Sequence, residues 1–360
     1  MRAAVLNAIG DDKLDVRDDV TTVDLAPGEV RIRVRAAGVC HSDVSGMNGT
    51  LPSLTPGILG HEASGEVVEV SDGVHDLAVG DRVILSWVPP CGACPACRRG
   101  QPYLCIVHVM QAYARPRFAV AGVPAFGMAG CGTFAEELVV PREGAVKIPA
   151  DTPFEVAALI GCGVTTGVGA VINTARVEPG STVVVIGCGG VGVAALQGAR
   201  LSGASVIVGV DPVPAKHALA KQFGATHTAT PDELTAVTAE LTGGEGFDYA
   251  FEVVGAAATI RSAWQAARRG GTVVVVGVGS MEAKVEFSAF ELLFDGKALL
   301  GSLYGSADVR RDYHRLLGLW RAGRLDLEGM ISRRLGLDDV NDALDALKGG
   351  EVVRQVIQFD

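Results

Sequence analysis

The stretch STVVVIGCGGVG, residues 181–192, decides the fold of this chain. Its first half, Ser181–Ile186, is an uninterrupted run dominated by β-branched side chains, which is typical of a strand buried in a parallel sheet. Its second half fits the pattern G-x-G-x-x-G, and a helix is predicted from about Val191 to Ser202. Such glycines permit a tight turn and let backbone N–H groups and the helix N-terminus reach the pyrophosphate of a dinucleotide. The residues expected at this contact are Gly187, Gly189, Gly190, Val191 and Gly192.

The acidic residue that follows this motif indicates which dinucleotide is bound. Asp211 ends the next predicted strand, Ser205–Val210, and lies 19 residues beyond Gly192. A carboxylate in that place accepts hydrogen bonds from a ribose diol and repels the extra phosphate of NADP, so we expect NAD. The alternative is a structural glycine turn followed by a helix-capping aspartate, because Asp211 precedes Pro212. The order strand, turn, helix, strand, aspartate favours the nucleotide site.

Strands and helices continue to alternate beyond this motif. Further buried strands are predicted at Phe247–Val253 and Thr272–Val278, and helices at Lys216–Phe223 and Ala257–Ala267. This alternation predicts an α/β fold with a Rossmann doubly wound parallel sheet.

The first half of the chain instead predicts a β-rich, barrel-like domain. Val30–Ala37 alternates apolar and charged residues, as a half-buried strand does. Short apolar runs bounded by turn residues follow it. They are Ser64–Val70, Arg82–Trp87, Phe134–Val140 and Ala145–Ile148, and a last strand is predicted at Val352–Phe359.

The bulk composition excludes several classes of partner. A chain of 360 residues suggests two domains, and 48% hydrophobic with 20% charged residues fits a well-packed enzyme. A net charge of −10 would repel nucleic acid. Purely aliphatic runs such as Val273–Val276 are far too short to span a bilayer, and residues 1–10 lack a secretory signal pattern. We therefore expect a soluble, cytoplasmic protein with neither a nucleic-acid nor a membrane partner.

Four of the eight cysteines lie within fifteen positions, at Cys91, Cys94, Cys97 and Cys105. Short C-x-x-C spacings let one loop deliver several thiolates to a tetrahedral zinc ion, and four thiolates leave no open position. The sequence thus favours a structural zinc site. An iron–sulfur cluster and a redox pair are the alternatives.

Three further candidate ligands, Cys40, His61 and Cys162, are far apart in the sequence. The stretch CHSD at 40–43 gathers polar groups after a predicted strand, and His61 precedes Glu62. Each residue also has a plain interpretation, because a lone cysteine is usually a small core residue. Spacing alone does not join the three.

Six motifs taken together resemble the zinc-containing alcohol dehydrogenases of the medium-chain dehydrogenase/reductase superfamily, class I and class III forms above all. The resemblance covers nearly the whole chain. The motifs are GVCHSD (38–43), GHEASG (60–65), the cysteine loop (91–105), GCGVTTG (161–167), GCGGVG (187–192) and DPVPAKHALAKQFGA (211–225).

The resemblance implies the domain organisation and the chemistry. Residues 1–163 and 306–360 would form a GroES-like catalytic domain, and residues 164–305 the NAD-binding Rossmann domain. The implied enzyme is a zinc-dependent alcohol dehydrogenase with two zinc ions per subunit, which transfers a hydride reversibly between NAD and a primary or secondary alcohol or its carbonyl product. Cys40, His61 and Cys162 would bind the catalytic zinc, the ligand type for which alcohol dehydrogenase is itself the standard example.

The same resemblance assigns the neighbouring residues. Ser42 would take the alcohol proton, Asp43 would hold His61, and Glu62 would lie near the zinc. Trp87 and Leu51 would line the substrate pocket. The implied cofactor contacts are His41 and Arg354 to the pyrophosphate, Lys216 to the ribose, and Thr166 and Val278 near the nicotinamide. The family's proton relay often ends at a histidine where this chain has Ser45.

Two alternatives remain within the resemblance. A nicotinoprotein would hold NAD permanently. A class III enzyme would oxidise a thiol adduct of formaldehyde, but the segment Gly49–Leu54 carries no charge near the pocket mouth, which favours an uncharged alcohol or aldehyde. The predicted edge strand Ala298–Leu303 could pair with its copy, so we expect a homodimer.

Overall fold

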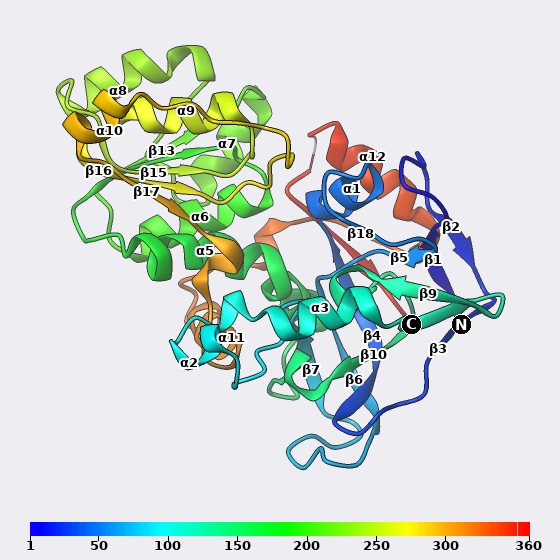
Figure 1. Ribbon diagram of the computed structural model, residues 1–360. Coiled ribbons are helices and arrows are strands. Elements are labelled where there is room, and N and C mark those ends of the chain that lie inside the picture. Colours follow the sequence, from blue (N-terminus) through cyan, green and yellow to red (C-terminus); the bar gives the residue numbers. More distant parts are fainter. Residues whose placement is uncertain (351) are drawn as a thin grey trace. The chain divides into compact units, whose positions relative to one another are not determined.

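The computed structural model describes residues 1–350 and 352–360 (Figure 1). It divides the chain into two compact units. The first consists of Met1–Gly163 with Asp308–Asp360, and the second consists of Val164–Ala307.

The second unit is built on a six-stranded parallel sheet in the order β14-β13-β12-β15-β16-β17 (Figure 1). From β12 near the centre the chain runs outward through β13 to β14, then returns to β15 on the other side of β12 and continues to β17. This is the doubly wound arrangement that the alternation predicts. The strands are β12 (Thr182–Ile186), β13 (Val206–Val210), β14 (His227–Ala229), β15 (Phe247–Glu252), β16 (Ala267–Val275) and β17 (Ala298–Gly301). The helices are α6 (Gly190–Leu201), α7 (Pro214–Gln222), α8 (Leu234–Thr242), α9 (Ala257–Ala266) and α10 (Ala289–Asp295).

The strand predicted at Thr272–Val278 is shifted toward the N-terminus in the structure. β16 already begins at Ala267, opposite Phe247, and an irregularity in its pairing with β15 follows. It ends at Val275, because the next two backbone N–H groups both donate to the Glu252 carbonyl, at 2.8 and 3.1 Å. Val278 therefore lies in the loop after the strand, with 47% of its surface exposed.

The first unit contains two sheets that enclose a common core. One has the order β2-β1-β5-β9-β8-β3, and the other has the order β11-β7-β6-β4-β19-β18, with β10 paired to β4. Strand β19 of the C-terminal segment inserts between β4 and β18. These strands are β1 (Ala3–Leu6), β2 (Asp15–Arg17), β3 (Val20–Thr22), β4 (Glu29–Val39), β5 (Gly57–Ile58), β6 (Ala63–Val70), β7 (Arg82–Leu85), β8 (Phe118–Val120), β9 (Val123–Gly127), β10 (Glu137–Pro141), β11 (Ala145–Lys147), β18 (Ile331–Leu335) and β19 (Arg354–Gln358).

The structure has both expected parts, a β-rich first unit and a Rossmann-like parallel sheet in the second unit. β4 shows why the sequence pattern succeeds in the first unit. Val30, Ile32 and Val34 are fully buried, while Arg31, Arg33 and Arg35 between them pair with glutamates on neighbouring strands. One face of the strand therefore enters the core and the other forms cross-strand ion pairs.

One helical stretch, Phe154–Ala175, is long and apolar enough to cross a membrane, but 89% of its most apolar window is buried within the protein. It contains α4 (Phe154–Leu159), the π-helical turn η4 (Ile160–Val164), α5 (Thr165–Gly169) and a second π-helical segment, η5 (Ala170–Ala175). Such burial is what the core helix of a globular domain shows. π-Helical turns are rare and occur frequently at functional sites, and η4 contains Cys162.

Candidate active site

The structure brings the three scattered candidate ligands together in the first unit. Cys40 follows β4 and begins α1 (His41–Met47), His61 lies between β5 and β6, and Cys162 is in η4. Their ligand atoms and a carboxylate oxygen of Glu62 all lie within 4.8 Å of one another. All four residues are buried.

Asp43 organises this cluster through three hydrogen bonds. Its Oδ2 accepts from the Cys40 N–H at 2.8 Å, and its Oδ1 accepts from the Gly60 N–H at 3.2 Å. The same Oδ1 lies 3.1 Å from Nδ1 of His61. Because Nδ1 bonds the carboxylate, Nε2 is the nitrogen left to bind a metal. Nε2 is buried and has no hydrogen-bond partner among the described residues. The site therefore fits a metal ion with two sulfur ligands and one nitrogen ligand.

Glu62 forms a buried ion pair with Arg354, and the Gly163 N–H donates to the same carboxylate oxygen at 3.2 Å. Burial raises the pKa of Glu62 to about 7 against the opposing effect of the Arg354 charge. Its other oxygen, Oε1, is buried and has no partner among the described residues. Glu62 thus presents one unsatisfied oxygen within the metal-ligand cluster.

Ser42 and Trp87, two of the residues predicted to contact the substrate, lie beside the cluster. The Ser42 Oγ is 3.8 Å from the Cys40 Sγ. The Trp87 ring meets the His61 ring edge to face, with centroids 6.3 Å apart. Leu51 is fixed to α1 by a 2.9 Å hydrogen bond from its N–H to the Ser45 carbonyl.

The four cysteines of the 91–105 loop form a second cluster, also with ligand atoms within 4.8 Å of one another. The Sγ atoms of Cys91 and Cys97 are 4.0 Å apart, and those of Cys94 and Cys105 are 3.9 Å apart. Sulfurs at about 2.3 Å from one tetrahedral ion are separated by about 3.8 Å, whereas a disulfide would need about 2 Å. The spacing therefore fits a metal site and excludes disulfides in this geometry.

Backbone N–H groups point at these sulfurs, as expected for thiolate ligands. The N–H groups of Cys91 and Cys94 lie 3.3 Å from the sulfurs of Cys105 and Cys91. The Cys97 N–H lowers the pKa of Cys94 to about 7. A lowered pKa increases the thiolate fraction that binds a metal.

The nucleotide motif lies in the second unit, where β12 passes through the glycine turn into α6. Gly187 has φ +101°, a conformation that favours glycine, and a Cβ on Gly192 would collide with the Gly187 carbonyl oxygen. The N-cap Gly189 supplies no side-chain hydrogen bond. The first N–H groups of α6 are therefore not capped by a side chain, as an anion site requires.

Asp211 lies beside this turn and is 4% exposed. Its two oxygens each accept a backbone hydrogen bond of 2.9 Å, from Cys188 and Val213, and Lys216 Nζ is 3.6 Å away. Thr166 is buried in α5 of the same unit, and a Cβ on the neighbouring Gly167 would collide with the Val191 carbonyl oxygen.

Two contacts were not predicted from the sequence. The ion pair of Arg354 with Glu62 joins residues 292 positions apart, and no local pattern marks either as the partner of the other. Arg354 is 2% exposed, while its expected contact with the pyrophosphate stays a prediction. His41 is exposed at the start of α1. The second unpredicted contact is the hydrogen bond of the Tyr313 hydroxyl with the carbonyl groups of Leu85 and Gly161.

Two domain signatures match the chain. The alcohol dehydrogenase GroES-like domain matches residues 26–150, and the zinc-binding dehydrogenase domain matches residues 190–320. An S-(hydroxymethyl)glutathione dehydrogenase from Paracoccus denitrificans is 37% identical over 349 residues, which are 92% of this chain and 93% of that protein.

Solved structures of similar proteins cover the whole length. Benzyl alcohol dehydrogenase from Acinetobacter calcoaceticus is 29% identical with a TM-score of 0.92, over 100% of this chain and 99% of that one. A putative zinc-binding dehydrogenase from Sinorhizobium meliloti, bound to NADP, is 30% identical with a TM-score of 0.81, over 99% of each chain. The chain therefore belongs to the zinc-containing alcohol dehydrogenase family of the medium-chain dehydrogenase/reductase superfamily, and it is an oxidoreductase that uses zinc and a nicotinamide cofactor.

Proposed function

We propose that the chain interconverts an uncharged alcohol and its aldehyde or ketone, with NAD as the hydride carrier and zinc held by Cys40, His61 and Cys162. The observation that carries the proposal is the convergence of these three ligand atoms and Glu62 within 4.8 Å, with the buried His61 Nε2 lacking a protein partner. A second zinc ion would be held by Cys91, Cys94, Cys97 and Cys105 and would stabilise the loop, because four thiolates leave no open position.

Zinc bound at the first cluster would act as a Lewis acid that favours loss of the alcohol proton. The chain's own residues would do the rest. Asp43 holds Nδ1 of His61 and the Cys40 N–H, and so fixes two ligands. Ser42, beside the Cys40 sulfur, would accept the alcohol proton. Because Ser45 replaces the relay histidine of the resemblance, we infer that the proton leaves through another group or through water.

We infer NAD rather than NADP from Asp211. Its carboxylate is fixed by two backbone N–H groups beside the glycine turn, where a 2′-phosphate would meet its negative charge. Thr166, Lys216, Val278, His41 and Arg354 are the further cofactor contacts that we propose. Because the similar protein from Sinorhizobium meliloti has NADP bound, the preference of this chain for NAD over NADP is to be measured.

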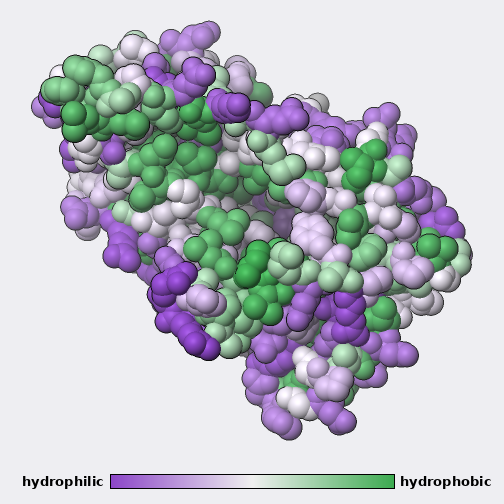
Figure 2. Space-filling model, in the orientation of Figure 1, coloured by the Kyte–Doolittle hydropathy of each residue, from purple (hydrophilic) through white to green (hydrophobic). Residues whose placement is uncertain are grey.

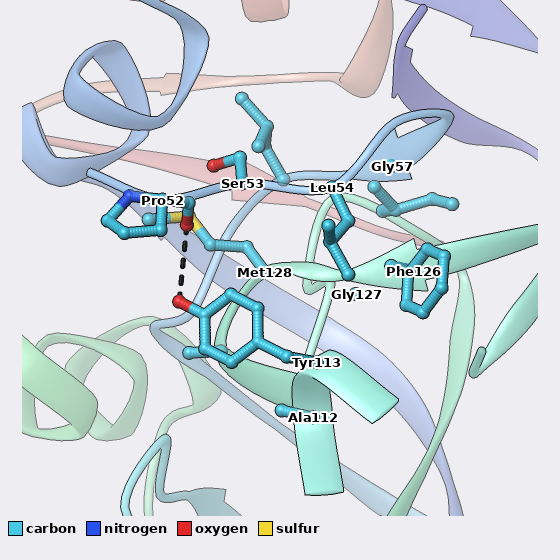
Figure 3. Close-up of a pocket in the computed structure, with 12 residues that line it drawn as sticks. Pro52, Ser53, Leu54, Gly57, Ala112, Tyr113, Phe126, Gly127 and Met128 are labelled. Carbon is cyan, nitrogen blue, oxygen red and sulfur yellow. Dashed lines mark hydrogen bonds between the residues drawn. The ribbon is translucent and has the colours of Figure 1, made fainter. Parts of the chain in front are cut away.

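We infer an uncharged alcohol in part from the uncharged segment that follows Leu51. Residues Pro52–Leu54, which directly follow Leu51, border a pocket whose other walls include Met128 and Phe126 (Figure 3). None of the described residues that line this pocket is charged. The second candidate substrate is the glutathione adduct of formaldehyde, which the name of the Paracoccus relative favours.

A substrate panel tests these proposals. Purified enzyme would be assayed with benzyl alcohol, a short aliphatic alcohol and S-(hydroxymethyl)glutathione, each with NAD and with NADP. We expect the highest kcat/KM with an uncharged alcohol and NAD. Preference for the glutathione adduct would replace the uncharged alcohol with the second candidate. Turnover with an external acceptor but no added NAD, with an NADH-like absorbance after purification, would identify a nicotinoprotein.

We also infer a cytoplasmic homodimer, with β17 as the contact. β17 is the edge strand of the parallel sheet, and all four of its residues are exposed. Nearby segments expose further large apolar side chains, and an apolar surface along an unpaired edge strand invites a second copy of the same strand. These side chains are Phe290, Leu292, Leu293, Phe294 and Leu303.

A further inference from the structure

The Tyr313 hydroxyl joins three parts of the first unit that are far apart in the sequence. Tyr313 is fully buried on α11 (Val309–Arg321). Its Oη lies 3.0 Å from the carbonyl oxygen of Leu85 and 3.3 Å from that of Gly161. Since a phenol has one proton, it donates a shared hydrogen bond to the two oxygens. Burying a hydroxyl is costly unless it is hydrogen-bonded, and the two carbonyls supply the acceptors here.

The two carbonyls belong to the segments that carry the active-site side chains. Gly161 immediately precedes the metal ligand Cys162. Leu85 ends β7, two residues before Trp87, whose ring contacts the His61 ring. The two segments also pack closely, because a Cβ on Gly161 would be 3.3 Å from the Leu85 carbonyl oxygen.

The helix that supplies the hydroxyl is itself fixed at its N-terminus. The N-cap Asp308 accepts a hydrogen bond from the Arg310 N–H at 3.3 Å. The Asp308 N–H in turn donates to the Asp312 carboxylate at 2.9 Å. Tyr313 follows Asp312 directly. Its hydroxyl is therefore held from a rigid first turn of the helix.

We propose that Tyr313 is a positioning residue for the catalytic zinc site, because it holds the backbone before Cys162 against the end of the strand that leads to Trp87. The inference rests on the proposed function of the Cys40, His61 and Cys162 cluster. Tyr313 acts on the site through the carbonyl groups of Leu85 and Gly161. Removing its hydroxyl takes one hydrogen bond from the carbonyl that precedes Cys162, and we expect this ligand to be held less firmly as a result.

Zinc release into an excess of a chromogenic chelator tests the proposal. The substitution Tyr313→Phe removes the hydroxyl and keeps the ring that fills the core. The matched control is Asn341→Ala, which removes two side-chain hydrogen bonds to Leu14, of 2.8 and 2.9 Å, elsewhere in the same unit. We expect the two zinc ions to leave in two kinetic phases. The phase that is absent when Cys40→Ala is assayed identifies release from the catalytic site.

We expect Tyr313→Phe to release the catalytic zinc about 10-fold faster than the unchanged enzyme, since residues that orient metal ligands typically contribute factors of 10 to 100 in metal affinity or activity. The structural zinc should leave at its usual rate, and Asn341→Ala should leave both phases unchanged. Unchanged catalytic release in Tyr313→Phe, or equal acceleration of both phases, would overturn the proposal and leave Tyr313 a packing residue.

A spectroscopic measurement covers the case in which Tyr313→Phe folds poorly. Enzyme with cobalt(II) in the catalytic site absorbs through its thiolate ligands, and we expect this band to shift in the folded fraction of Tyr313→Phe but not in Asn341→Ala. An unshifted band would contradict the proposal. Zinc content reports separately on the proposed function: equal zinc content in the unchanged enzyme and in Cys40→Ala would refute the catalytic site itself, whatever Tyr313 does.

Discussion

Single residues of this chain show how far local sequence predicts an active site. The motif positions of Cys40, His61 and Cys162 mark candidates, but only the fold brings them within reach of one ion. Asp43 was assigned to His61 from the resemblance, and the structure adds its bonds to the Cys40 and Gly60 N–H groups. These additional bonds are to backbone groups, which no residue pattern reveals.

The Asp43→Asn substitution tests this role at the residue scale. An amide presents one oxygen and one NH2 to three groups that all donate, so at least one donor would face another donor. We expect kcat/KM to fall 10- to 100-fold with a matching loss of catalytic zinc, measured by steady-state kinetics and metal analysis. Asp248→Asn, which likewise removes a carboxylate bonded to a backbone N–H in the other unit, should leave the zinc content unchanged. Equal zinc content in Asp43→Asn and the unchanged enzyme would contradict the assignment.

Two cysteines outside both clusters should be chemically inert. Burial raises the pKa of Cys131 and of Cys188 to about 12. Since each pKa lies above its ordinary value, the thiol form dominates up to high pH, and at pH 8 only about one molecule in ten thousand carries the thiolate. We expect neither residue to be alkylated by iodoacetamide at pH 8 in the folded enzyme, as read by mass spectrometry. Rapid labelling of Cys131 at pH 8 would contradict the burial and the raised pKa of this thiol.

At the scale of elements, segments with a clear apolar pattern were predictable, and some of the shortest strands were not. β4, β12, β13 and α6 follow clear patterns of period 2 or 3.6 or continuous apolar runs, and their ends agree with the sequence to within two residues. β5 has only two residues and β3 only three, which is too short for any periodicity. Their pairing depends on partners far along the chain, such as β5 with β9.

We propose that a zinc ion holds the cysteine loop, and Cys94→Ser tests this proposal. We expect one zinc per chain instead of two and a Tm lower by roughly 10 °C, because losing a metal ligand costs several kcal/mol and each kcal/mol shifts Tm by about 2–4 °C in domains of this size. kcat per active site should stay within about 2-fold, since these four sulfurs serve a separate cluster from that of Cys40. Calorimetry with metal analysis measures both, and two retained zinc ions with an unchanged Tm would contradict the assignment.

For the molecule as a whole, the exposed apolar side chains of the second unit are the strongest sign of assembly. Figure 2 shows hydrophobic residues gathered on the visible face of the molecule. The edge-strand side chains Leu299 and Leu300 are 42% and 36% exposed, and Leu293 on α10 is 75% exposed. The sequence predicts this edge strand, but its exposure follows from how the rest of the chain packs around it, which no local pattern shows.

The Leu300→Lys substitution tests the dimer. A charge on the edge strand disfavours pairing with a second copy, so we expect the mass from size exclusion with light scattering to fall from two chains to one at micromolar concentration. Val79→Lys is the control, since Val79 is 67% exposed in the other unit. A dimer that survives Leu300→Lys would place the interface elsewhere.

Zinc content and alcohol oxidation measured together on the unchanged enzyme and on Cys40→Ala test the central claim most directly. The account predicts two zinc ions per chain and NAD reduction for the unchanged enzyme, and one zinc ion and no measurable turnover for Cys40→Ala. Two zinc ions and an unchanged kcat in Cys40→Ala would show that Cys40, His61 and Cys162 do not hold the metal at which the alcohol reacts.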